Sequence, residues 1–355
     1  MTVRSRTRTR WAALAVAPLI VAVVLIVSLS HTGGRKATPP AATAVAAAPW
    51  FAPYVDLTLT PEPRFQTSAA DPSRRVVLGF IIADAHNPCT PTWGGVSALG
   101  QATALNAQIA QAQTAHEQVI VSFGGAEGSD LAVGCSTPAK LEAAYASVVT
   151  HYHVSTIDLD VEGPASLSSA VAARRAHAIA ALQQDRVMAG APRAVWLTLT
   201  VSPNGLEPSG VAAIQKMLEA GVKLAGVNVL AFDYGPLAGR TMVTASESAL
   251  TATANQLQAL YRAQHVRPGA DGVWSQLGAT IMEGHTDIAG QVWTLADART
   301  LYRFATAHHL GRLSEWSLGR DQPCSGAPAQ PTAYCSGVPQ HPFEFSEGLA
   351  GGDPP

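Results

Sequence analysis

Strand-like and helix-like segments alternate along most of this 355-residue chain. The strand-like segments are short apolar runs rich in β-branched residues, and most segments between them are alanine-rich with helical spacing. Eight such runs occur, at residues 54–58, 76–83, 118–122, 155–161, 195–201, 227–232, 277–282 and 313–318. Eight strands with helical connections predict an α/β fold, a closed (β/α)₈ TIM barrel.

An open, doubly wound sheet is the alternative architecture for such an alternation. That sheet usually carries a glycine-rich phosphate loop after its first strand, and this sequence has none at that place. In a barrel, functional residues gather at the carboxyl ends of the strands. Chemistry is therefore expected where each apolar run ends.

The N-terminus has the features of an exported chain. Four arginines, at positions 4, 6, 8 and 10, precede an apolar stretch that runs from residue 11 to about residue 27. Its length approaches the roughly 20 residues that span a bilayer, and the alanine-rich candidate cleavage site lies well downstream. We expect a transmembrane signal anchor over residues 1–30, with the rest of the chain extracellular at the cell membrane. Cleavage and secretion is the alternative.

Residues 31–49 are mostly glycine, proline, alanine and threonine, with almost no side chain to bury. This composition predicts a flexible linker between the anchor and a catalytic barrel at residues 50–355. The formal net charge of −2 argues against a nucleic-acid partner, because such proteins usually present a basic face. We expect a monomer.

The chain has four cysteines, and an even number in an exported chain indicates two disulfides. Cys324 and Cys335 share one segment rich in glycine and proline and are expected to pair. Cys89 and Cys135 each follow a predicted strand, so they can meet on one rim. A zinc site is the rival interpretation, but no C-x-x-C pair and no clustered histidines support a metal.

Three acids, Asp158, Asp160 and Glu162, alternate with aliphatic residues in the fourth run. A period of two places the three carboxyl groups on one face of a strand, about 6.6 Å apart. Such neighbours repel one another, so at least one proton is held or shared, and the outermost acid, Glu162, gains proton affinity. A site that donates a proton beside a carboxylate needs this arrangement, whereas folding alone does not.

This segment resembles the fourth-strand signature D-G-x-D-x-D-x-E of the family 18 glycoside hydrolases, the chitinase family, and of its single-domain bacterial members. The last three acids match, while Ser155 and Thr156 replace the leading Asp-Gly pair. Other segments resemble further motifs of the family, in order: S-x-G-G at 122–125, M-x-Y-D at 230–233, and a final W-S-x-x-R-D at 316–321. The resemblance covers roughly residues 50–350.

The resemblance implies substrate-assisted, retaining hydrolysis of β-1,4-linked N-acetylglucosamine chains, with a chitin-like substrate and without a cofactor. In that mechanism Glu162 is the general acid and base. Asp160 holds the acetamide of the sugar, and Asp158 orients Asp160 and shares its proton. Because Ser155 carries no charge where the family has Asp, we expect Asp158 to ionise more readily.

Four further residues are expected to bind substrate. Trp316 is the candidate floor beneath the reacting sugar, because an indole matches the apolar face of a pyranose ring. Asp233 and Tyr234 are expected across the site, within reach of the acetamide, and Phe232 lacks the hydroxyl that the family's Tyr provides.

Two other functions share the same barrel. One is a lectin-like binding protein that keeps the groove without turnover, although such members commonly lose the acid that Glu162 provides here. The other is hydrolysis of a different N-acetylated glycan, such as peptidoglycan.

Overall fold

The computed structural model describes residues 48–59, 65, 74–188, 190, 193–269, 271–325 and 332–352, which belong to one unit of the chain, 46–355. The expected signal anchor, and the expected linker except for its last two residues, lie outside the described residues. Among the helices that the structure describes, none combines the length and apolar character needed to cross a bilayer.

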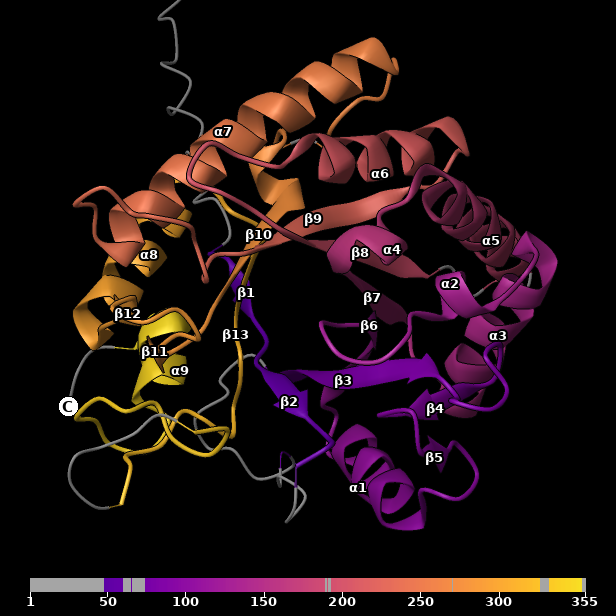
Figure 1. The fold of residues 1–355 in the computed structure, drawn as a ribbon, viewed down its shortest axis with the longest axis horizontal. Coiled ribbons are helices and arrows are strands. Elements are labelled where there is room, and N and C mark those ends of the chain that lie inside the picture. Colours follow the sequence, from indigo (N-terminus) through magenta and orange to yellow (C-terminus); the bar gives the residue numbers. More distant parts are fainter. Residues whose placement is uncertain are drawn as a thin grey trace, which may run out of the picture. The chain divides into compact units, whose positions relative to one another are not determined.

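Parallel strands occupy eight positions around a closed sheet (Figure 1). Two short strands, β1 (Trp50–Phe51) and β2 (Tyr54–Asp56), share the first position. β1 pairs with the last strand, β13 (Arg312–Glu315), and β2 pairs with the strand at the second position, β3 (Arg75–Ala83). The other positions are β6 (Gln118–Gly124), β7 (Thr156–Val161), β8 (Ala194–Thr200), β9 (Leu224–Leu230) and β10 (Leu277–Ile281). The described strands therefore form a TIM-type barrel, as the sequence predicts.

Six longer helices surround this sheet in Figure 1: α1 (Thr103–Thr114), α3 (Pro138–His151), α5 (Ser169–Met188), α6 (Pro208–Glu219), α7 (Met242–Ala263) and α8 (Leu295–His308). Local sequence sets where they begin. The hydroxyl of Thr137 accepts a hydrogen bond from the backbone of Lys140, and Pro138 fits the first turn. Thr294 and Asp297 form a reciprocal capping box at the start of α8.

Several shorter elements lie outside the eight strand positions and the six longer helices. An antiparallel extension, β4 (Pro91–Trp93) and β5 (Ser97–Ala98), follows β3, and a small sheet, β11 (Gly284–His285) and β12 (Val292–Trp293), follows β10. The remaining short helices are α2 (Leu131–Gly134), α4 (Gly163–Ser166), η1 (Trp274–Gln276) and α9 (Glu344–Leu349).

Both expected disulfides are present. The Cys89–Cys135 bridge joins the segment after β3 to the end of α2, and Cys324–Cys335 closes a loop near the C-terminus. The zinc alternative is wrong for these four cysteines, since none of them is free.

The barrel has an apolar outer layer and a polar interior. Ile157, Leu159 and Val161 of β7 are buried in the main hydrophobic cluster, together with residues from the surrounding helices. The side chains that alternate with them face the barrel axis, where a buried polar set collects from six strands: Ser122, Asp158, Thr198, Asn228, Thr280, Arg312 and Ser314. The alternation of β7 therefore carries its carboxyl groups into the interior, as predicted.

Candidate active site

The three acids follow one another from the middle of β7 to just beyond its end. Asp158 pairs in register with Ser122 on one neighbouring strand, and Asp160 pairs with Gly124. Asp158 is fully buried and Asp160 is 3% exposed, whereas Glu162 is only partly buried at the N-cap of α4. Exposure to solvent thus increases from Asp158 to Glu162, as the sequence predicts.

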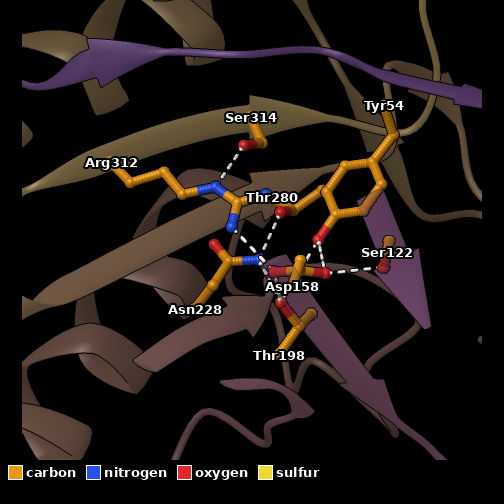
Figure 2. Close-up of polar contacts among 8 residues, drawn as sticks. All are labelled: Tyr54, Ser122, Asp158, Thr198, Asn228, Thr280, Arg312 and Ser314. Carbon is orange, nitrogen blue, oxygen red and sulfur yellow. Dashed lines mark hydrogen bonds and ion pairs between the residues drawn. The ribbon is translucent and has the colours of Figure 1, made fainter. Parts of the chain in front are cut away.

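Asp158 is held by donors on both carboxylate oxygens (Figure 2). Tyr54 Oη and Ser122 Oγ donate to Oδ2, at 2.9 Å and 2.7 Å. Thr198 Oγ1 and Arg312 Nη1 donate to Oδ1, at 2.7 Å and 2.8 Å. The contact with Arg312 is an ion pair between two completely buried side chains. These four donors come from four different strands, so the closed barrel itself fixes the position of Asp158.

Asp160 lies one strand repeat closer to the mouth and is far less well paired. Its Oδ1 is buried and accepts no hydrogen bond from the described residues. Burial raises the pKa of Asp160 well above its ordinary value, and the charges of Glu162 and Asp158 raise it further against the opposing charge of Arg312. Asp160 is therefore a buried acid with a raised pKa, and its Oδ1 is an acceptor without a donor among the described residues.

Glu162 holds a proton near neutrality. Its pKa is raised from 4.5 to about 7, first by burial and then by the charge of Asp233. The sequence predicts this direction from repulsion within the fourth strand, and Glu162 and Asp160 do repel each other. The structure adds a second anion, Asp233, which follows β9 and lines the same cavity as Glu162.

A cavity of about 120 Å³ opens where the strands end, and both Asp160 and Glu162 line it. Its other lining residues come from loops and strand ends around the barrel: Tyr54, Phe80, Ala126, Leu230, Phe232, Asp233, Thr280, Met282, Asp287 and Trp316. One side is aromatic, because Phe80 stacks on Trp316 at 5.3 Å between ring centroids and Tyr54 meets Trp316 edge-on at 6.0 Å. In this cavity, Asp160 and Glu162 therefore lie together with a flat aromatic wall.

Two glycines of the 122–125 segment allow this close packing. A Cβ atom on Gly124 would lie 2.0 Å from the backbone oxygen of Asp160, and Gly124 has a φ of +103°. On Gly125 it would lie 2.8 Å from the ring of Phe80, at a φ of +87°. Any larger residue would displace the acid strand or the aromatic wall.

The structure brings Phe232, Asp233 and Trp316 to the cavity, but not Tyr234. Tyr234 is 1% exposed, and its hydroxyl pairs with Ser246 Oγ at 2.8 Å, in the layer of α7. The prediction that Tyr234 binds substrate is therefore corrected. Residues 232–234 lie beyond the end of β9, and Asp233 has a φ of +50°, so the backbone turns there and carries Tyr234 toward α7.

Ser155 also lies elsewhere than the sequence analysis assumes. It is exposed at the start of the fourth strand, whereas Thr156 is buried and accepts a hydrogen bond from Gln118 Nε2. Residues 156, 158, 160 and 162 share one face, so Ser155 is on the other. Ser155 therefore does not lie beneath Asp158 in the row of acids, and the expected effect of Ser155 on Asp158 has no basis in the geometry.

Several important residues escape the sequence analysis, among them Tyr54, Phe80, Asp287 and Arg312. Phe80 and Tyr54 sit inside apolar runs, where an aromatic residue ordinarily indicates core packing. Arg312 gives a clearer signal, because it begins the eighth strand and charged residues are rarely fully buried unless they are paired. Within the described residues no group of three or more His, Cys, Asp or Glu side chains could hold a metal ion.

No protein-family model matches the chain. The chain is 31% identical over 304 residues to the probable bifunctional chitinase/lysozyme of Escherichia coli strain K12, which covers 84% of this chain and 34% of that protein. It is 30% identical over 285 residues to endochitinase 11 of Metarhizium anisopliae, which covers 78% of this chain and 53% of that protein. The chain therefore spans only about a third and about half of these two relatives.

Solved structures agree with this similarity. The catalytic domain of a hyperthermophilic chitinase from Pyrococcus furiosus aligns with a TM-score of 0.74 at 25% identity, over 85% of this chain and 94% of that chain. A GH18 chitinase from Pseudoalteromonas aurantia aligns with a TM-score of 0.52 at 19% identity, over 76% of this chain and 94% of that chain, and supports the fold alone.

Proposed function

This chain is a chitinase-like protein of glycoside hydrolase family 18, and on that basis we propose that it is a glycosidase that cleaves β-1,4 linkages between N-acetylglucosamine units. One observation carries the proposal. Asp160 and Glu162, both with raised pKa values, line one cavity together with Trp316. The chitinase names of the relatives support a chitin-like glycan as the substrate.

In the proposed first step, Glu162 donates its proton to the glycosidic oxygen, and the bond to the leaving sugar breaks. A pKa of about 7 leaves Glu162 protonated in mildly acidic solution, as this role requires. The acetamide carbonyl oxygen of the substrate attacks its own anomeric carbon and forms an oxazolinium ion. Glycosidases of this family are known to use such substrate assistance in place of a protein nucleophile.

Asp160 orients the acetamide during this attack. Its buried Oδ1 has no hydrogen-bond donor among the described residues, and the acetamide N–H is a donor of the right kind. In the second step the ionised Glu162 removes a proton from water, which attacks the anomeric carbon. The oxazolinium ring opens, the acetamide is restored, and the configuration at the anomeric carbon is retained.

Trp316 is proposed as the platform for the reacting sugar. Its indole is held by the stacked ring of Phe80 and the edge contact with Tyr54, so it presents a fixed apolar surface. Phe232 and Asp233 lie in the same cavity and are proposed to contact the bound sugar.

The test is release of a fluorophore from a chitobiose glycoside by the full chain and its Glu162→Gln variant. Loss of the general acid is expected to lower kcat by roughly 10²-fold or more. Glu219→Gln is the matched control, because it makes the same change at an exposed position at the end of helix α6 and should retain activity. Full activity of Glu162→Gln would refute the role of Glu162. Sugar binding without turnover by the unmodified chain would favour a binding protein.

A second candidate substrate follows from the name of one relative, which pairs chitinase with lysozyme. Peptidoglycan also carries N-acetylated sugars, so the same acetamide chemistry applies to it. Release of soluble fragments from purified cell walls by the unmodified chain, absent with Glu162→Gln, would add this substrate.

A further inference from the structure

The carboxylate of Asp158 has no acceptor position left for a proton. Each oxygen accepts two hydrogen bonds, so the four donors described above occupy the roughly four lone-pair sites of a carboxylate. Protonation of Asp158 would displace one of these donors. It would also leave Arg312 as a buried cation without its anion, which is strongly unfavourable.

Arg312 has no comparable alternative partner. Asp158 is its one ion-pair partner among the described residues, and its Nε donates to Ser314 Oγ at 2.8 Å. The guanidinium lies 5.3–5.5 Å from the ring centroids of Trp50, Tyr54 and Trp196, so aromatic faces enclose the charge. Burial opposes this charge, but Tyr54 and Asp158 outweigh it, and the pKa of Arg312 is raised.

Asp160, unlike Asp158, has mainly negative charges around it. It faces the negative charges of Asp158 and Glu162 along its own strand. Asp130 adds a weaker negative contribution, and Asp130 is itself paired with Arg175 at 2.6 Å. Among the described residues, the cation that lowers the proton affinity of Asp160 is Arg312, and Arg312 already binds Asp158 directly. The inner pair of acids is therefore asymmetric.

We propose that Arg312 is a positioning residue that keeps Asp158 as a carboxylate, so that the single proton of the inner pair resides on Asp160 instead of being shared. This deepens the proposed function and rests on it for its catalytic meaning. The fixed anion stands behind Asp160 and stabilises the positive charge of the developing oxazolinium ion. Asp160 then needs no proton rearrangement with Asp158 before it binds the acetamide.

The proton positions can be measured without any turnover. In full-length protein with ¹³C-labelled aspartate carboxyl groups, NMR chemical shifts distinguish a protonated carboxyl group from a carboxylate, and Asp158→Asn and Asp160→Asn variants assign the two signals. Between pH 5 and pH 7 we expect a carboxylate at Asp158 and a protonated group at Asp160. A protonated Asp158, or two intermediate shifts that titrate together, would overturn the proposal whether or not the chain is a chitinase.

Variants then test the role of Arg312 itself. Arg312→Met removes the positive charge, so Asp158 can take up a proton. On the acidic side of the pH profile of kcat/KM, the fall in activity should therefore occur at a pH higher by roughly one unit or more. Arg312 does not line the cavity, so kcat should fall more than KM rises. Arg312→Lys retains the charge and should keep the acidic limb nearer its original position.

Thr198→Val is the matched control, because it removes a neutral donor from the same oxygen of Asp158 and leaves the charge in place. It should move the acidic limb by less than Arg312→Met does. Equal shifts in all three variants would mean that Arg312 is merely structural, which would refute the proposal. If Arg312→Met does not fold, the carboxyl shifts of the unmodified protein and the profile of Arg312→Lys still decide the question.

Discussion

Replacing Asp233 with Asn tests which charge sets the proton affinity of Glu162. The structure gives two causes for the raised pKa of Glu162, burial first and the charge of Asp233 second. Removing the smaller cause should lower this pKa by less than half of the interval between 4.5 and about 7. The expected change is therefore about one pH unit at most, equivalent to roughly tenfold in proton affinity.

The Asn side chain suits this position. Asp233 has a φ of +50°, in the left-handed region where Asn and Asp are the most readily tolerated residues other than glycine. The carbonyl oxygen of Asn can replace Oδ1 of Asp233, which accepts a hydrogen bond from the backbone N–H of Asp287 at 3.1 Å. The substitution thus removes a charge while preserving the loop.

The assay is the pH dependence of kcat/KM with the fluorogenic chitobiose substrate. The active form of Glu162 is protonated, so activity is present below its pKa and is lost as the pH rises through about 7. In Asp233→Asn the loss should begin at lower pH, so the variant is weaker at pH 8 even where rates at pH 5 are similar.

Asp287→Asn is the control, because Asp287 lines the same cavity but is not among the charges that raise the pKa of Glu162. Its alkaline limb should stay in place. If the alkaline limb of Asp233→Asn does not move, or moves to higher pH, the electrostatic coupling between Asp233 and Glu162 is refuted.

Three further predictions concern the strand and its supports. Ser155→Asp should leave the pH profile unchanged, because residue 155 is exposed and lies on the opposite face from the acids; a shifted acidic limb would contradict this placement. Gly124→Ala should cost about 3 kcal/mol or more of unfolding free energy in chemical denaturation, since its Cβ would meet the backbone of Asp160 at a positive φ. Cys135→Ser should cost about 4 kcal/mol and Cys335→Ser about 3 kcal/mol, because their bridges span 46 and 11 residues; the reverse order in denaturation would contradict the loop-entropy reasoning.

The barrel could be predicted because its signal is local and repeated. Each apolar run has strand length, most runs are separated by a helical segment, and closure of eight parallel strands follows from general rules of chain topology. The first strand position shows the limit of this reasoning. Two short strands share it, since β1 pairs with β13 and β2 pairs with β3, and no periodicity within six or seven residues could reveal that division.

The site could be predicted only where its residues share a strand or a motif. The alternation of the acids placed them on one face. Residues 232–234 lie beyond the end of β9, where alternation no longer applies, so the burial of Tyr234 away from the cavity could not be predicted in this way. The partners of those acids lie far away in sequence, since Tyr54 and Arg312 are 104 and 154 residues from Asp158. Contacts of that kind are set by strand order and register, which a single sequence does not state.

Asp158, Asp160 and Glu162 differ because each has different neighbours from the other strands and loops. Arg312 and three hydroxyl groups stabilise a charge on Asp158, whereas burial and neighbouring anions keep the proton of Asp160. Glu162, nearer the mouth, owes its pKa of about 7 to burial and to Asp233. Environments that push the proton affinities of adjacent acids apart assign them separate chemical roles. The spacing of two residues therefore creates the repulsion, and the closed barrel decides which acid carries each proton.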